Sequence, residues 1–154
     1  MRIKSAITIA AASILLHCSL VLGEAPSSSN PAIAEQSQLL QGTWEGVEVG
    51  REAEGKCTLT ITGDSIHFQG SQKEEWYKAT FTLSPETNPM KLVATITDCP
   101  SPDVIGKPAV AIYKFENDSL TLAGHQPGAD NAPLSFEGDR SSRTFVFKKA
   151  AVNK

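Results

Sequence analysis

Apolar residues recur at every second position through most of this chain, in short runs separated by turn-forming residues. In residues 56–62, for example, Cys57, Leu59 and Ile61 share one face and three threonines share the other. About eight such runs occur, and no helical pattern lies between them. Parallel strands need crossover helices, so the pattern excludes a parallel sheet and predicts an all-β antiparallel fold, either a sandwich or an up-and-down barrel.

The expected elements follow from these runs and from the turn residues between them. Asn117 and Asp118 form a tight-turn pair, and Gly63 with Asp64 forms another. One short helix is expected at residues 33–41, ended by Gly42. The expected strands are residues 43–49, 56–62, 65–69 and 76–83, a run around 92–96, residues 110–115, a run around 120–122, and residues 144–148.

The first 23 residues have the layout of a secretory signal peptide. Arg2 and Lys4 precede a mainly apolar run at residues 7–16, and small residues follow it. We expect cleavage after Gly23 and export to the periplasm or the cell exterior. The apolar run is too short for a membrane span, so none is expected in the mature chain. A lipid anchor on Cys18 is the weaker alternative, because His17 precedes that cysteine where a lipoprotein signal has a small residue.

Length and composition fit one domain after this signal. The 154 residues carry a formal net charge of −3 and are 40% hydrophobic, which excludes a disordered chain and disfavours a nucleic-acid-binding role. We expect a flexible leader at residues 24–32, a barrel domain at residues 33–149 and a tail at residues 150–154. No sequence feature indicates an oligomer, and a monomer is expected.

Two cysteines, Cys57 and Cys99, remain after the expected cleavage. In an oxidising compartment such a pair forms a disulfide more often than a metal site or a nucleophile. The expected Cys57–Cys99 disulfide would stabilise the domain by about 3–4 kcal/mol in the chain-entropy model. Two free buried thiols are the alternative.

Gly42-Thr43-Trp44 opens the first expected strand directly after the helix. It resembles the Gly-x-Trp signature of lipocalins, whose tryptophan packs across the closed end of the barrel, so structural roles are expected for Gly42 and Trp44. Together with residues 59–64, 88–91 and 111–120, in that order, residues 40–44 resemble a small secreted bacterial lipocalin-like domain family of unknown function, abundant in planctomycetes and their relatives.

This resemblance covers about residues 39–149. It implies export and a lipocalin-like antiparallel up-and-down barrel of about eight strands with a short N-terminal helix, and it implies no activity. Ala132-Pro133 departs from the Arg-Pro pair that such domains often carry before the last strand. Any role of that arginine therefore cannot be transferred to this chain.

No group of residues predicts catalysis, metal binding or a cofactor. The sequence has no phosphate-binding glycine-rich loop, no His-Glu-x-x-His and no Gly-x-Ser-x-Gly. His67 lies in a strand and is expected to face solvent. His125 lies in a Gly/Pro loop with no ligand spacing around it. The adjacent carboxylates Glu74 and Glu75 and the cation Arg143 are interpreted as solvated surface charges.

A closed barrel of about eight strands has either a solid core or room for one small ligand. Two small residues on inward faces leave room, and two tyrosines supply polar groups. The expected ligand-binding residues are Tyr77, Ala79, Phe81, Ala94, Ile96 and Tyr113. The first hypothesis is a non-enzymatic carrier of a small apolar or amphipathic molecule. The alternative is a protein-interaction or inhibitor module with a solid core that uses loops 98–108 and 124–133. An enzyme is the third.

Overall fold

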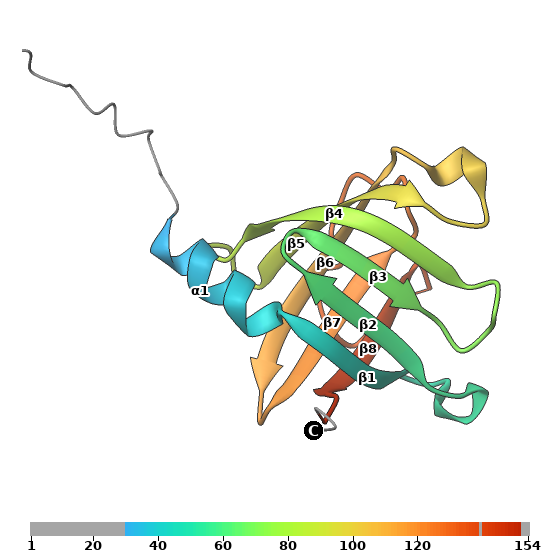
Figure 1. Ribbon diagram of the computed structural model, residues 1–154, viewed down its shortest axis with the longest axis horizontal. Coiled ribbons are helices and arrows are strands. Elements are labelled where there is room, and N and C mark those ends of the chain that lie inside the picture. The colour runs from blue at the N-terminus through green and yellow to red at the C-terminus, as the bar shows by residue number, and fades with distance from the viewer. Residues whose placement is uncertain (1–29, 139, 152–154) are drawn as a thin grey trace, which may run out of the picture.

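The computed structural model describes residues 30–138 and 140–151, and in these residues eight antiparallel strands close into a barrel (Figure 1). The strands pair in chain order, and the first pairs with the last to complete the ring. The elements are α1 (Pro31–Leu40), β1 (Gly42–Glu48), the 3-10 turn η1 (Glu52–Glu54), β2 (Cys57–Thr62), β3 (Ser65–Gln69), β4 (Trp76–Ser84), β5 (Met90–Asp98), η2 (Pro102–Val104), β6 (Pro108–Glu116), β7 (Ser119–His125) and β8 (Ser142–Lys149). The predicted up-and-down barrel with a short N-terminal helix is therefore confirmed.

The hairpin turns follow from residues that tolerate left-handed backbone. Asn117 and Asp118, between β6 and β7, have φ angles of 49° and 60°. This pair of positive φ angles belongs to the turn whose twist matches that of the strands it joins. Gly63 has a φ of 61° between β2 and β3. Both turns lie where the sequence predicts them.

Helix α1 begins at Pro31, two residues earlier than expected. The Asn30 side chain accepts a hydrogen bond of 3.1 Å from the Ala32 amide, and Pro31 occupies the first turn, where its missing N–H costs nothing. Part of the expected 24–32 leader is therefore helical. The expected signal peptide, Cys18 and residues 24–29 lie outside the described residues. Within the described ranges, no helix is long and apolar enough to cross a membrane.

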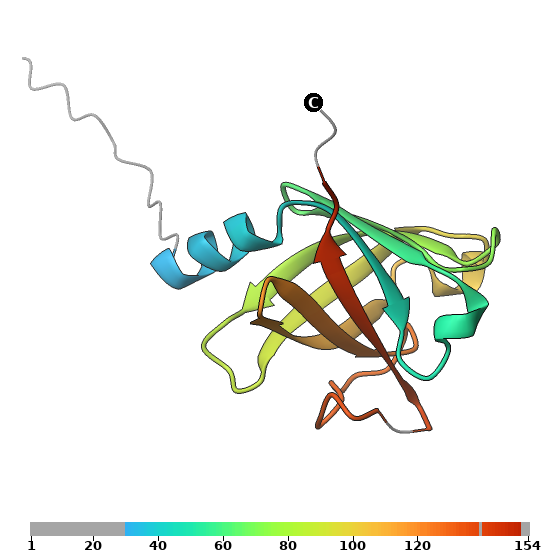
Figure 2. The same cartoon turned by 90° about the horizontal axis from the view of Figure 1, so that it is seen from below.

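One end of the barrel, here called the closed end, carries α1 and the β2–β3, β4–β5 and β6–β7 turns (Figures 1 and 2). Leu40, the last residue of α1, is fully buried in the core there. Trp44 is 4% exposed, donates a hydrogen bond of 2.8 Å from Nε1 to the Leu40 carbonyl, and lies 6.0 Å from Phe115 between ring centroids. Lys149 belongs to β8, the strand that closes the barrel, and its ammonium lies 5.3 Å from the centroid of the Trp44 ring. Trp44 thus joins helix, first strand and last strand.

The opposite end, the open end, carries the longer β1–β2, β3–β4, β5–β6 and β7–β8 connections. The β7–β8 connection packs back against the outside of the barrel. Ile112 and Ala123 are fully buried although their neighbours Tyr113 and Leu122 take the inner face, and Pro133 in the connection is also buried. The Lys114 ammonium, on the same outer face, lies 5.0 Å from the centroid of the Phe136 ring. Part of the loop expected to be available for partners, around Pro133, is therefore used in packing.

Candidate functional site

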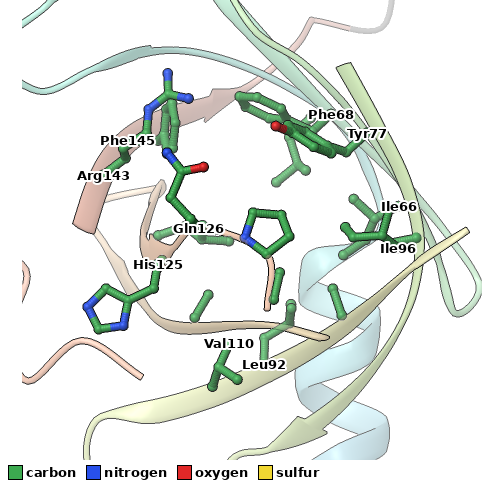
Figure 3. A pocket seen from close by; sticks show the side chains of 18 of the residues that line it. Ile66, Phe68, Tyr77, Leu92, Ile96, Val110, His125, Gln126, Arg143 and Phe145 are labelled. Carbon is green, nitrogen blue, oxygen red and sulfur yellow. The ribbon is translucent and has the colours of Figure 1, made fainter. Parts of the chain in front are cut away.

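A cavity of about 150 Å³ occupies the half of the barrel near the open end. Its lining side chains come from β2 to β8 and from the start of the β7–β8 connection. Figure 3 shows the rings of Phe68 and Tyr77 together at one side, with Leu92 and Val110 at the opposite side. The interior is therefore not a solid core throughout.

The cavity exists because small side chains leave room beside and across from large aromatic ones. Four aromatic residues from β3, β4 and β8 form what we call the aromatic wall: Phe68, Tyr77, Phe145 and Phe147. Neighbouring rings in this wall contact one another, with centroid separations of 5.2 to 6.5 Å. Five residues from β4 to β7 form the small-residue wall: Ala79, Ala94, Ala109, Ala111 and Gly124.

Four members of the small-residue wall form two cross-strand pairs, while Ala79 pairs with Ile66 on β3 and with Ile96 on β5. Ala94 pairs with Ala109 between β5 and β6, and Ala111 pairs with Gly124 between β6 and β7. A side chain longer than alanine at these positions would extend into the space that the aromatic wall leaves. The open volume is thus set by residue size on four adjacent strands.

Four of the six predicted ligand-binding residues line the cavity, namely Tyr77, Ala79, Ala94 and Ile96. The prediction that Phe81 and Tyr113 also line it is wrong, because both lie deeper, towards the closed end. Tyr113 is fully buried and packs edge-on against Phe115, 6.1 Å away between centroids. Burial also raises the pKa of Tyr113 to about 12, so it stays neutral. The alternation of apolar residues predicted which face of each strand points inward, but it did not predict how far from the open end each residue lies.

Arg143 lines the mouth of the cavity and contacts two carboxylates that lie beside the mouth without lining it. We call these three residues the rim triad: Glu48, Glu75 and Arg143. The Arg143 guanidinium donates to both oxygens of Glu48, with 2.9 Å from Nε to Oε1, and also donates through Nη1 to Glu75 Oε1. These residues come from the end of β1, the β3–β4 connection and the start of β8. The interpretation of Glu75 and Arg143 as solvated surface charges is wrong, since their side chains are only 21% and 30% exposed.

The ion pair between Glu48 and Arg143 favours the charged form of both side chains. The hydrogen bond from Arg143 holds the pKa of the Glu48 carboxyl below its usual value, against the opposing effect of burial. The two carboxylates raise the pKa of Arg143, so the guanidinium stays charged. One cation and two carboxylates leave the rim triad with a formal charge of −1.

Gly70 makes room for the rim triad. A Cβ atom at this position would overlap the carboxyl end of the Glu75 side chain, which folds across the Gly70 backbone. The Gly70 amide also donates to the Glu75 carbonyl, at 2.6 Å. Sequence reasoning missed the triad because Glu75 and Glu48 lie 68 and 95 residues before Arg143, and no local pattern brings them together.

The predicted Cys57–Cys99 disulfide is not found, and the structure instead has two free buried thiols. Cys57 begins β2 and Cys99 follows β5, so β3 and β4 lie between them in the wall. Three strand spacings correspond to roughly 14 Å along the sheet, well beyond the roughly 7 Å that a disulfide permits between Cα atoms. The Cys99 thiol instead donates to the Ser101 carbonyl, at 3.1 Å.

We therefore expect both cysteines to react with iodoacetamide in denaturant without any reductant. In the native protein the reaction of Cys57 should be slow at neutral pH, because burial raises its pKa to about 11 and only the thiolate is nucleophilic. Peptide mapping by mass spectrometry after each treatment measures this. A Cys57–Cys99 cross-linked peptide in the denatured, unreduced sample would contradict the structure.

The two described histidines do not form a metal site. His67 is exposed on β3, as expected. His125 ends β7 and donates from Nδ1 to the Asn131 carbonyl, at 2.9 Å. No three His, Cys, Asp or Glu side chains come together as metal ligands in the part of the chain that the structure describes.

A second depression lies at the closed end, between α1 and β4. Its volume is about 360 Å³, but it is a surface groove bordered by few residues, among them Ile33, Phe81 and Leu83. Nineteen of the described residues line the cavity inside the barrel, and the permanently charged one among them, Arg143, lies at its mouth. We therefore regard the interior cavity as the candidate site.

The fold and the site together define an antiparallel up-and-down barrel with an apolar internal pocket that opens at one end. Comparison with protein-family models, with curated proteins and with solved structures finds no match to this chain.

Proposed function

We propose that the protein is an exported, non-enzymatic member of the lipocalin-like family described above, and that it binds one small apolar or amphipathic molecule inside the barrel. The observation that carries this proposal is the apolar cavity at the open end, with Tyr77, Gln126 and Arg143 as the polar groups at or near its mouth. Sites for small molecules are typically apolar hollows with a few convergent polar groups.

The size of the cavity limits the ligand. Drug-sized molecules occupy sites of roughly 300–1,000 Å³, whereas an apolar cavity of about 150 Å³ accepts benzene. A cavity of about 150 Å³ is therefore suited to a molecule with one ring rather than to a long-chain fatty acid. Parts of a larger ligand would have to remain outside the mouth.

Calorimetric titration with toluene tests the proposal. We expect saturable binding with one molecule per chain, and a rise in unfolding temperature with toluene concentration, because a ligand that binds only the folded state stabilises it. The Ala94→Trp variant should lose this binding, since its indole would fill the space beside the small-residue wall. The Ala53→Trp variant is the matched control, because Ala53 is exposed in η1 and makes no part of the cavity.

Two results would contradict the proposal. One is a folded wild-type protein that binds neither toluene nor xenon. The other is binding that persists in a folded Ala94→Trp variant at wild-type affinity. If Ala94→Trp does not fold, Ala94→Leu introduces a smaller group at the same wall and should weaken toluene binding in the same direction.

A protein-interaction role is the second candidate, supported by two exposed apolar side chains in the connections between strands. Leu134, in the β7–β8 connection, is 96% exposed, and Ile105, in the β5–β6 connection, is 46% exposed. Exposed apolar side chains on loops are common contacts for partners. A barrel that binds no apolar probe would favour this role.

A further inference from the structure

The geometry points to an uncharged single-ring aromatic molecule as the ligand, with the rim triad excluding carboxylates of the same shape from the site. This inference rests on the proposed function, because it concerns the same cavity. It names the ligand class and assigns a specificity-determining role to Glu48 and Glu75, residues that do not themselves line the cavity.

The two walls favour a flat ring. The aromatic wall presents ring faces and edges, including the pair of Phe68 and Tyr77 with planes 28° apart and centroids 6.5 Å apart. The small-residue wall opposite presents only methyl groups and backbone. A planar ring can contact the aromatic wall by offset or edge-on packing while its other face lies on the alanines. A bulky aliphatic group would fill this space less completely.

An arginine at the mouth of an apolar pocket would ordinarily suggest a carboxylate ligand. Here the charge of Arg143 is already matched twice, by the two-pronged contact with Glu48 and by the contact with Glu75. The guanidinium has five N–H donors, so it keeps some for a neutral acceptor. Its single positive charge, however, is outweighed by the two carboxylates that it contacts.

A carboxylate ligand would therefore meet an unfavourable environment inside the cavity and beside Arg143. The interior offers apolar side chains, and burying an anion there without a free cation is costly. Among the described residues that line the cavity, Arg143 is the only permanently charged one, and the rim triad to which it belongs has a formal charge of −1. The other titratable lining residues are Tyr77 and His125; burial raises the pKa of Tyr77, and His125 already contacts Asn131.

An uncharged polar substituent fits the same mouth. Gln126 extends from the end of β7 at the mouth, on the side where Arg143 lies (Figure 3). Its amide offers both a donor and an acceptor, and the structure shows no hydrogen bond to this side chain within the described residues. A ring bearing an amide or hydroxyl group could place that group beside Gln126 and Arg143 while the ring stays inside.

Benzamide and benzoate provide the sharpest test, because they have nearly the same shape and differ in charge. In the wild-type protein we expect benzamide to bind at least about tenfold more tightly than benzoate at pH 7, as measured by calorimetric titration at low salt. Added salt should reduce the difference in affinity between benzamide and benzoate, because salt screens the exposed parts of the triad.

The Glu48→Gln/Glu75→Gln variant keeps the size of both side chains but removes their charges. Arg143 then becomes an unmatched cation at the mouth, so benzoate affinity should rise at least about tenfold while benzamide affinity changes much less. The Glu45→Gln/Glu116→Gln variant is the matched control: both residues are exposed, and the same two charges are lost away from the cavity. Its preference should remain that of the wild type.

A second variant tests the rim triad without changing any charge. In Gly70→Ala, the new Cβ would displace the carboxyl end of Glu75 from its place beside Arg143. The preference for benzamide over benzoate should then narrow. If the Glu48→Gln/Glu75→Gln variant does not fold, Gly70→Ala alone tests whether the rim triad sets the preference for benzamide over benzoate.

The outcomes separate this inference from the proposed function. Benzoate that binds the wild type as tightly as benzamide, or a preference unchanged in Glu48→Gln/Glu75→Gln, would overturn the inference while toluene binding kept the proposed function intact. Toluene binding without benzamide binding would also overturn the inference and leave the proposed function intact. Failure of toluene, xenon and benzamide alike would overturn both.

Discussion

Replacing Trp44 with alanine is expected to lower the free energy of unfolding by about 3–5 kcal/mol, a large part of the stability of a domain this size. The indole is 4% exposed and packs near Phe115, so its removal would leave a cavity at the closed end. It would also leave the Leu40 carbonyl without the Nε1 donor that ties α1 to the barrel. Urea unfolding followed by circular dichroism measures the change.

Trp76→Ala is the matched control for this prediction. Trp76 begins β4 at the open end and is only half-buried, with the Lys78 ammonium 5.4 Å from its ring centroid. The same substitution there should cost much less than at Trp44. Similar losses at the two sites would mean that Trp44 does not hold the closed end together.

Replacing Arg143 with leucine is expected to lower the free energy of unfolding at pH 7 by about 2–3 kcal/mol, less than for a fully buried ion pair because the side chains keep some exposure. The loss arises mainly because Glu48, 13% exposed, would remain ionised beside Glu75 with no guanidinium between them. Arg51→Leu is the matched control. Arg51 is 57% exposed and approaches Glu48 only to 3.8 Å, so its loss should cost little.

The same variant should change how stability depends on pH. In the wild type the pKa of Glu48 is lowered on folding, so its contribution is present above its ordinary value of 4.5 and is lost as the pH falls through the lowered value. In Arg143→Leu this contribution is absent, and burial instead favours the protonated carboxyl. The difference in stability between the two proteins should therefore shrink below about pH 4.5. A difference that stays constant from pH 7 to pH 3 would contradict the assigned role of the ion pair.

The fold could be predicted from the sequence because each strand carries its own signal. Alternation places Ala79 and Ala94 on inward faces, and the Asn117-Asp118 pair marks a hairpin, each from a few neighbouring residues. Where both ends of a strand were expected, the observed ends lie within two residues of them. In a meander of consecutive hairpins, local signals therefore largely determine the order of the sheet.

The site could be predicted only in part, because a pocket depends on height along the barrel as well as on the face of each strand. A two-residue repeat of apolar residues does not show how far along the barrel a side chain lies. It cannot distinguish Tyr113, beside Phe115 at the closed end, from Tyr77 at the open end. The rim triad has no local signal at all, since Arg143 meets Glu48 from the far end of the chain. The disulfide prediction failed for the same reason: the presence of two cysteines says nothing about the strands between them.

The pairing of β1 with β8 gives the domain a cyclic architecture. Trp44 lies opposite Lys149 in that pairing, and the Ala150 amide donates to the Thr43 carbonyl at 2.8 Å, so the first and last residues of the barrel are neighbours. What defines such a ring is the cyclic order of its hairpins rather than the point at which the chain begins. A peptide joining the end of β8 to the start of α1 would keep the helix and allow new termini at an exposed turn such as Asn117-Asp118. Circular permutation at that turn would keep every strand next to its present neighbours, with the pocket and its rim built from the same eight strands.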